Sequence, residues 1–209
     1  MEKVVHALGA VAEFMQLAER FKDIPGFLAQ AEGYALHLLA RQGPGEGEVV
    51  EIGSFMGLST CWLASGLVQA GRGKVTAVDT FQGSPEHQSD PHLKTILAEG
   101  RLFDAFQLCL ERHGLADHVQ PLVGDAHQIS AAWKRPIRLL FIDGDHSYEG
   151  VRRDYVDWES FVVPGGLVCF HDVGGWDGVT RFYTEKMLKN PGYRESVGVN
   201  SLRTFIKQG

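Results

Sequence analysis

The sequence predicts an α/β fold with a mostly parallel sheet and helices on both faces, and three observations support this prediction. Apolar runs of strand length alternate five times with amphipathic runs of helix length. The 25 glycines fit a fold with many turns between strands and helices. Two short strand-like segments close the chain after the last helix. Alternation of this kind is typical of parallel sheets whose strands are connected by helices.

Length and charge restrict the classes of protein to consider. A chain of 209 residues fits one domain, with N-terminal helices over residues 1–45 and the sheet over residues 46–209. The content of 44% hydrophobic and 22% charged residues is ordinary for a globular chain. The formal net charge of −6 disfavours non-specific binding to nucleic acid. No apolar run is long enough to span a membrane, so we expect no membrane partner.

The cysteines favour a reducing compartment. Cys61, Cys109 and Cys169 all lie in apolar surroundings, and no two of them form a C-x-x-C pair. Buried thiols are the simplest interpretation of this arrangement. We therefore expect a cytoplasmic protein.

Two helices are expected before the sheet begins. The first has apolar residues on one helical face, namely Val4, Leu8, Val11, Met15 and Ala18. This face either packs against the core or makes a contact in a homodimer, and packing is the simpler interpretation. The second helix is expected from Phe27 to about Arg41. Its inward-facing residues are expected to be Leu28, Ala31, Ala35 and Leu39.

The first strand ends in a turn with two glycines four residues apart. The apolar run Val49–Ile52 contains Glu51 and precedes Gly53 and Gly57, and a helix is expected from Leu58. Glycine lets the backbone pass close to a ligand, and a helix N-terminus points free N–H groups toward it. The pattern E-x-G-x-x-x-G is neither a dinucleotide fingerprint nor a P-loop, and an ordinary turn remains the alternative. Glu51 suits hydroxyl groups or a cation and repels phosphate.

Two further strands are followed by an acidic residue. Asp79 follows the strand at residues 74–78, and its carboxylate either accepts hydrogen bonds from ribose hydroxyls or caps a turn. The ribose role is favoured. Asp125 follows the strand Val119–Val123, and it either accepts from an adenine amino group or caps a helix that begins near Ala126. Both roles stay open for Asp125.

A polar loop and a long helix are expected between these two strands. The loop, Thr80–His92, is expected to cover the mouth of a pocket, with His87 and His92 as surface histidines. The helix is expected from Leu93 to about His113. Its core residues are expected to be Leu97, Leu102, Phe106 and Leu110.

Two apolar strands in the last third of the chain end in acidic and histidine residues. Ile137–Ile142 runs into Asp143-Gly144-Asp145-His146, and Leu167–Phe170 runs into His171-Asp172. Trp176 either walls a binding pocket or packs in the core. The other elements expected here are a helix with Val151, Tyr155, Trp158 and Val162 on one face, a turn at Pro164–Gly166, a helix at Val179–Leu188, and strands at Tyr193–Val199 and Leu202–Ile206.

Four acids are expected to line one edge of the sheet. Glu51, Asp79, Asp125 and Asp143 each lie at or just past the end of a different strand. The carboxyl ends of parallel strands meet at the edge where open α/β sheets bind ligands. The coincidence of four acids is therefore stronger evidence for a binding cleft than any one of them.

A second group, at the ends of the fourth and fifth strands, suits a metal ion. Asp143 should approach His171 and Asp172, because their strands are expected to be neighbours. Oxygen ligands that converge at a cleft suit Mg²⁺, which keeps positions open for water or substrate. The alternative is that His146 and His171 only form hydrogen bonds in a polar cleft.

The motifs resemble a known family. The pattern E-x-G-x-x-x-G at residues 51–57 resembles the first motif of class I S-adenosylmethionine-dependent methyltransferases. The stretch F-I-D-G-D-H-S-Y-E-G-V, with P-G-G-L-V-C-F-H-D after it, resembles the metal-dependent O-methyltransferases of macrolide sugars, the macrocin O-methyltransferase-like methyltransferase family 24. Val78–Gly83 also resembles that branch, and the resemblance covers roughly Ile24 to Asp172. It implies a Rossmann-like, seven-stranded, mostly parallel sheet with a terminal antiparallel strand and an N-terminal helical cap.

The resemblance also implies site residues. Asp143 and Asp172 match metal ligands, and His146 matches the general base. His171 stands where the family usually has an acid. A histidine can still bind a metal, but it shifts the preference toward Mn²⁺, Fe²⁺ or Zn²⁺ or weakens binding, and Asp145 is an alternative ligand. The residues expected to hold S-adenosylmethionine are Glu51, Gly53, Ser54, Gly57, Ser59, Thr60, Asp79, Thr80, Phe81, Asp125, Ala126 and Asp143.

The predicted function is S-adenosylmethionine-dependent methylation of a hydroxyl group on a small molecule. A divalent metal, Mg²⁺ or Mn²⁺, would lower the pKa of the acceptor hydroxyl, and a histidine would accept its proton. Two rivals share the predicted sheet: a nicotinamide-dependent oxidoreductase, and a non-catalytic module that only binds the cofactor. The identity of the acceptor and the presence of a homodimer are left open by the sequence.

Overall fold

The centre of the molecule is a seven-stranded sheet in the order β3-β2-β1-β4-β5-β7-β6. The computed structural model describes residues 1–84 and 93–209. Strands β3, β2, β1, β4 and β5 are parallel neighbours, and β7 is antiparallel to both β5 and β6. The prediction of a mostly parallel sheet with a terminal antiparallel strand is confirmed. The strands are β1 (Glu48–Ile52), β2 (Val75–Asp79), β3 (Val119–Val123), β4 (Ile137–Ile142), β5 (Val162–Phe170), β6 (Tyr193–Val199) and β7 (Leu202–Lys207).

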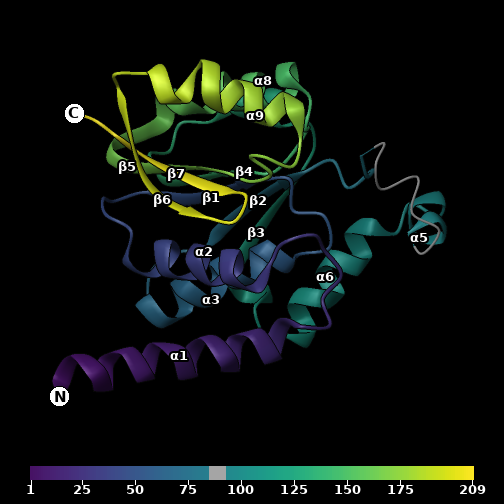
Figure 1. Cartoon of the computed structure of the whole chain (residues 1–209). Coiled ribbons are helices and arrows are strands. Elements are labelled where there is room, and N and C mark those ends of the chain that lie inside the picture. Colours follow the sequence, from purple (N-terminus) through teal and green to yellow (C-terminus); the bar gives the residue numbers. More distant parts are fainter. Residues whose placement is uncertain (85–92) are drawn as a thin grey trace.

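Helices cover both faces of this sheet (Figure 1). One layer contains α2 (Gln30–Gln42), α3 (Leu58–Ala70) and α6 (Leu102–Arg112). The opposite layer contains α7 (Ala126–Ala132), α8 (Tyr148–Trp158) and α9 (Asp177–Glu185). The remaining elements are α1 (Glu2–Phe21), α5 (Lys94–Ala98), η1 (Ala116–His118), η2 (Glu159–Phe161) and η3 (Met187–Lys189).

The alternation of side chains along β4 explains why each face has its own core. Leu139 and Phe141 belong to the cluster that includes Trp62 of α3, whereas Leu140 and Ile142 belong to the cluster that includes Trp158 of α8. Both faces of a central parallel strand are buried, so the strand reads as a continuous apolar run. The buried residues Val151, Tyr155 and Trp158 confirm the predicted inner face of α8. The fourth predicted member, Val162, begins β5 instead.

The turn predicted at Pro164–Gly166 is wrong, because these residues lie inside β5. The register between β4 and β5 moves from Ile137↔Val162 to Leu139↔Leu167 across this point. The β5 side therefore carries extra residues, and the segment forms a bulge within a longer strand.

The long helix predicted from Leu93 to His113 is divided into α5 and α6. Gly100 lies between them with a φ of 65°, in the left-handed region that ends helices. The expected core residues Leu102, Phe106 and Leu110 are buried in α6. Of the polar loop predicted at Thr80–His92, the part with His87 and His92 lies outside the described residues.

The buried face of α2 differs from the predicted one. It is formed by Glu32, Gly33, Leu36, His37 and Ala40. Of the residues expected to face inward, Ala31 is exposed, and Leu28, Ala35 and Leu39 are only half-buried. The prediction failed because the polar residues Glu32 and His37 lie on the buried face. The apolar pattern therefore predicted a face displaced by one residue from the observed one. A Cβ atom on Gly33 would lie 2.3 Å from Nε1 of Trp62, so glycine lets α2 approach α3 closely.

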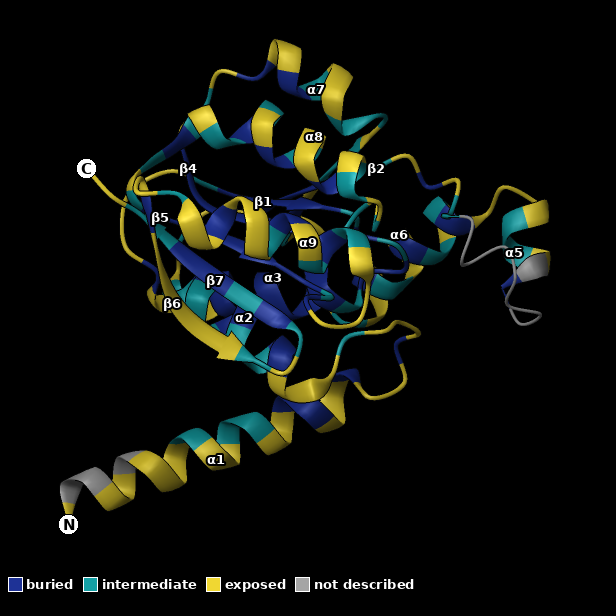
Figure 2. Cartoon of the chain, turned by 45° about the horizontal axis from the view of Figure 1, so that its top comes forward, coloured by how far each residue is buried: buried dark blue, intermediate teal, exposed yellow. Residues whose placement is uncertain are grey.

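The buried residues of α1, among those whose side chains the structure describes, lie at its C-terminal end. Leu17, Ala18 and Phe21 pack into the core. Four of the five residues predicted to pack are instead exposed: Val4 by 61%, Leu8 by 64%, Val11 by 54% and Met15 by 64%. The expectation of core packing is therefore wrong for this part of the helix, which extends away from the body of the protein (Figure 2). Among the described residues, no helix combines the length and the apolar character needed to cross a membrane.

Candidate functional site

The glycine turn after β1 passes directly over the end of β4. Gly53 has a φ of 86°, and a Cβ atom at this position would lie 2.1 Å from the carbonyl oxygen of Asp143. Gly57, with a φ of 92°, is the N-cap residue of α3. Only glycine meets both demands, the left-handed backbone and the close approach, at residue 53.

Asp79 holds this turn in place. Its Oδ2 atom accepts hydrogen bonds from the backbone N–H groups of Ser54 and Phe55, both at 2.8 Å, and its Oδ1 atom accepts from Phe81 N–H at 2.7 Å. The carboxylate therefore joins the ends of β1 and β2. Asp79 also lines the cavity described below, where the ribose role stays a prediction.

Glu51 is fully buried behind the turn. Its Oε2 atom accepts hydrogen bonds from the hydroxyls of Ser54, at 2.8 Å, and Thr60. Its Oε1 atom has no hydrogen-bond partner among the described residues. Burial raises the pKa of this carboxyl to about 7, with a smaller contribution from the negative charge of Asp143. Glu51 and Thr60 are not among the described residues that line the two cavities introduced below. Their hydrogen bond stabilises the turn from the side away from these cavities.

Replacing Glu51 by glutamine is expected to remove a loss of stability at high pH. The pKa of Glu51 is raised from 4.5 to about 7, so its contribution to stability is full below pH 4.5 and is lost as the pH rises through 7. Between pH 4.5 and 8, the free energy of unfolding of the wild type should fall by on the order of 3 kcal/mol because of Glu51. The Glu51→Gln variant should not show this fall. Urea unfolding at both pH values measures this difference. Equal losses in the two proteins would show that Glu51 ionises normally in the fold.

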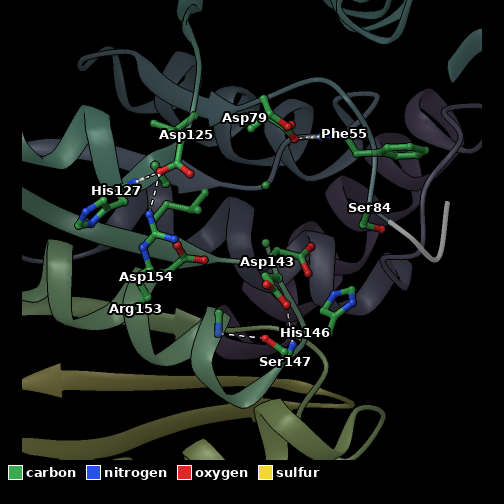
Figure 3. Close-up of a pocket in the computed structure, with 18 of the residues that line it drawn as sticks. Phe55, Asp79, Ser84, Asp125, His127, Asp143, His146, Ser147, Arg153 and Asp154 are labelled. Atoms are coloured by element: carbon green, nitrogen blue, oxygen red, sulfur yellow. Dashed lines mark hydrogen bonds and ion pairs between the residues drawn. The ribbon is translucent and has the colours of Figure 1, made fainter. Parts of the chain in front are cut away.

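A cavity of about 640 Å³ opens at the carboxyl ends of β1 to β4. Figure 3 shows Asp79 and Asp125 on one side of it and Asp143 and His146 on the other. The predicted meeting of acids from separate strands is confirmed for these three acids. The other predicted cofactor residues on its wall are Gly53, Thr80 and Ala126, whereas the predicted residues Gly57 and Phe81 are not on the wall of either cavity.

Both roles considered for Asp125 fit the geometry. Its Oδ1 atom accepts from His127 N–H at 2.8 Å and from Gln128 N–H at 3.3 Å, so it caps α7. The same oxygen lies 3.3 Å from the guanidinium of Arg153. Because Asp125 is half-exposed and lines the cavity, it can also accept a hydrogen bond from a ligand.

Asp154, a residue that the sequence did not single out, lines the same cavity from α8 (Figure 3). Burial raises the pKa of its carboxyl to about 7, and the charge of Asp145 adds to this effect. A carboxyl group that is partly protonated near neutral pH can donate a hydrogen bond as well as accept one. Its position in the middle of an amphipathic helix gave no local signal of this environment.

A second cavity, of about 460 Å³, adjoins the first. The two share part of their walls, formed by Gly53, Phe55, Asp143, Gly144, His146 and Trp176. Phe27, Leu28 and Leu58 add apolar surface to the second cavity, and Ser54 and Ser59 also line it. Trp176 is 41% exposed and stacks on the ring of His146, with 4.8 Å between ring centroids. It therefore walls both cavities and does not belong to the core.

Acidic and histidine side chains gather where the cavities meet. Asp143, His146 and Asp172 each offer a ligand atom within 4.8 Å of the others, which is close enough for a shared metal ion. Nε2 of His146 lies 3.1 Å from Oδ2 of Asp172. Two carboxylates and one imidazole make a donor set that suits Mn²⁺ or Fe²⁺ as well as Mg²⁺.

His171 lies beside Asp143 and Asp172, as predicted, and it also contacts Glu32, which was not predicted. Its Nδ1 atom lies 3.1 Å from Asp143 Oδ1 and 3.5 Å from Asp172 Oδ2, and its Nε2 atom lies 3.2 Å from Glu32 Oε2. Burial alone would lower the pKa of His171, but the three carboxylates outweigh it and raise the pKa to about 12. Both ring nitrogens then carry protons and point to carboxylates, so neither has a lone pair to offer a metal in this arrangement. The predicted role as a metal ligand stays a prediction.

Glu32, which the sequence reading also missed, connects this cluster to the C-terminal hairpin. Its Oε1 atom accepts from the backbone N–H of Ser201 at 2.8 Å and from the Ser201 hydroxyl at 2.7 Å, and its Oε2 atom accepts from Ala29 N–H at 2.9 Å. Burial would raise the pKa of Glu32, but the hydrogen bonds from His171 and Ser201 lower it to about 2. Glu32 lies four residues before the buried Leu36, on the same helical face. This spacing was the signal that could have predicted the burial of Glu32.

Comparison with known proteins places this site in a family. The sequence model of a family described as "Methyltransferase domain" matches residues 50–173, more than half of the 209-residue chain. Among solved structures, cofactor-bound Rv0187 from MTB is 23% identical, with a TM-score of 0.63 over 96% of this chain and 90% of that one.

Two further structures are O-methyltransferases. TomG from Streptomyces achromogenes, in complex with SAM, is 20% identical, with a TM-score of 0.60 over 96% of this chain and 90% of that one. The O-methyltransferase from Bacillus cereus, in complex with SAH, is 22% identical, with a TM-score of 0.59 over 95% of this chain and 91% of that one. At these identities the likeness concerns the fold. From the family match and the strand order, the chain belongs to the methyltransferase domain family, with the fold of class I S-adenosylmethionine-dependent methyltransferases.

Proposed function

We propose that the protein transfers a methyl group from S-adenosylmethionine to a hydroxyl group of a small molecule. The observation that carries this proposal is the shared wall of the two cavities. A cofactor in the larger cavity and an acceptor in the smaller one would meet beside Asp143 and His146. Structures similar in fold were solved with SAM or SAH, and two are named O-methyltransferases, which agrees with the proposal.

The acids of the larger cavity suit the cofactor. Asp79, Asp125 and Ala126 line this cavity. Asp79 would accept hydrogen bonds from the ribose hydroxyls, and Asp125 and the backbone of Ala126 would bind the adenine. Gly53 and Asp143 would face the methionine part, near the junction with the smaller cavity. Glu51 and Thr60 would contribute indirectly, by holding the turn that carries Gly53.

His146 is proposed as the proton acceptor. Its Nε2 atom lies 3.1 Å from Oδ2 of Asp172, so this carboxylate would stabilise the positive charge that the imidazole gains with the proton. With S-adenosylmethionine bound, the acceptor oxygen would form the bond to the methyl carbon as the carbon–sulfur bond breaks, and His146 would take the proton of the hydroxyl group. Stacking against Trp176 fixes the plane of the imidazole during this step.

A divalent cation fits beside this base, with Asp143 and Asp172 as its carboxylate ligands. A bound cation would lower the pKa of the acceptor hydroxyl. The protonated His171 behind these carboxylates already offsets part of their charge, so it would weaken cation binding. We therefore expect Mn²⁺ to bind more weakly here than at a site where residue 171 is an acid.

The smaller cavity suits an acceptor without strong negative charge. No lysine or arginine is found among the described residues that line it, whereas Asp143 and Asp172 are. Phe27, Phe55 and Trp176 supply aromatic surface for the rest of the molecule.

Calorimetric titration with S-adenosylhomocysteine and with NADH tests the proposal and its main rival. We expect S-adenosylhomocysteine to bind and NADH not to bind. The substitution Asp79→Asn should weaken S-adenosylhomocysteine binding, whereas Asp117→Asn, on the distant segment η1, should leave it unchanged. Binding of NADH alone would overturn the proposal in favour of an oxidoreductase. Binding of S-adenosylhomocysteine without methyl transfer to any of a panel of hydroxylated acceptors would favour a non-catalytic module.

A further inference from the structure

Helix α1 carries an apolar stripe that the fold leaves in solvent. The stripe consists of Val4, Leu8, Val11 and Met15, each more than half exposed. Figure 2 shows the helix extending from the body with mostly exposed residues along its first half. A contiguous apolar surface of this kind marks an interaction site on a soluble protein.

Among the side chains that the structure describes, the hydrogen bonds that anchor the helix to the body begin at Ala10. The hydroxyl of Tyr34 donates to the carbonyl of Ala10 at 3.1 Å and to the carboxylate of Glu13 at 2.9 Å. Arg41 holds the same carboxylate at 2.7 Å. These contacts fix the direction of α1. They lie beyond the first two turns of the helix, and short helical segments are only marginally stable in water on their own.

The spacing of the stripe fits a second helix. Its residues follow one another by four, three and four positions, and Ala18 continues the pattern by three. Apolar residues that alternate by three and four form the seam of paired helices, in which each side chain enters a gap on the partner. A flat or irregular partner surface would not require this regular spacing.

Charge favours another copy of the chain over a membrane surface. Residues 4–12 contain no Asp, Glu, Lys or Arg, so two such stripes can approach without repulsion. Helices that lie on membranes carry Lys and Arg on their polar face, and residues 4–16 contain neither. The net charge of −6 further disfavours an anionic lipid surface.

We propose that α1 pairs with α1 of a second copy through this stripe, to form a homodimer with two-fold symmetry. The same surface on both copies is self-complementary, as such symmetry requires. The stripe lies outside both cavities. A result against the dimer would therefore not contradict the proposed methyl transfer, and a result against methyl transfer would not contradict the dimer.

Light scattering after size-exclusion chromatography tests this proposal. The wild type should have twice the 23.1 kDa mass of one chain, and the double variant Leu8→Glu/Met15→Glu should have the mass of one chain. Gln16→Glu is the matched control, because it adds negative charge at an exposed position on a different face of α1 and should remain dimeric. The uncharged double variant Leu8→Ser/Met15→Ser should also dissociate. Circular dichroism checks that each variant is folded.

Two results would overturn the proposal. The first is a monomeric wild type at micromolar concentration, and sedimentation of that monomer with phosphatidylglycerol vesicles would assign the stripe to a lipid surface. The second is a folded Leu8→Ser/Met15→Ser variant that keeps the dimer mass.

Discussion

Replacing His146 by alanine is expected to lower the rate of methyl transfer by about 10²–10⁴-fold, the usual contribution of a general base. The affinity for S-adenosylhomocysteine should change little, because the ring lies on the wall shared with the acceptor cavity and faces Asp172. A single-turnover rate with a methylated acceptor as product, and calorimetry with S-adenosylhomocysteine, separate these two effects.

Two further variants sharpen this test. His146→Gln keeps a side chain of similar length that cannot accept the proton, so it should lose as much rate as the alanine variant. His118→Ala, in η1 and away from both cavities, should keep the wild-type rate. A His146→Gln variant with wild-type turnover would remove the histidine from the chemistry and leave it a role in packing against Trp176.

Replacing Glu32 by alanine is expected to destabilise the fold by about 3–5 kcal/mol, as the removal of one member of a buried ion pair usually does. Glu32 is 2% exposed, and its carboxylate accepts from His171, Ser201 and Ala29. The alanine variant leaves all these donors without their acceptor, and it leaves the buried positive charge of His171 to Asp143 and Asp172 alone. Urea unfolding at neutral pH measures the loss.

The exposed ion pair of Glu149 with Arg152 provides the control. Glu149→Ala removes a carboxylate of the same kind from a pair at 2.8 Å, but the Glu149 side chain is 73% exposed. Exposed pairs contribute about 0–1 kcal/mol, so this variant should unfold almost as the wild type does. Glu32→Gln keeps an oxygen that can accept a hydrogen bond from Ser201. Its free energy of unfolding should therefore lie between those of Glu32→Ala and Glu149→Ala. Equal stability of Glu32→Ala and Glu149→Ala would contradict the structural role assigned to Glu32.

The sequence was most informative where a pattern is local. The apolar runs predicted β3 and β4 at their observed bounds. The acids at or just past the ends of β2, β3 and β4 meet at one cavity, as expected from parallel strands. The glycine turn after β1 was also predicted from a local pattern, whereas its close approach to Asp143 was not.

It was least informative where the structure depends on tertiary contacts. Glu32 and His37 look like surface residues of a helix, and only the packing of α2 shows that they are buried. The second nitrogen of His171 is engaged by Glu32, a partner 139 positions away, which no local motif indicates. The exposed stripe of α1 has the periodicity of a buried face, because periodicity reports that a face is apolar and does not report what covers it.

The hydrogen bonds from Ser201 to Glu32 have a consequence for synthesis of the chain. They join positions 169 residues apart, from the second helix to the final hairpin. A growing polypeptide emerges from the ribosome with its N-terminal half first, so the partner of Glu32 becomes available only when translation is nearly finished. Until then, the charged cluster around His171 lacks one of its supports. The enzyme should therefore acquire its finished reaction centre late, after most of its sheet has already assembled.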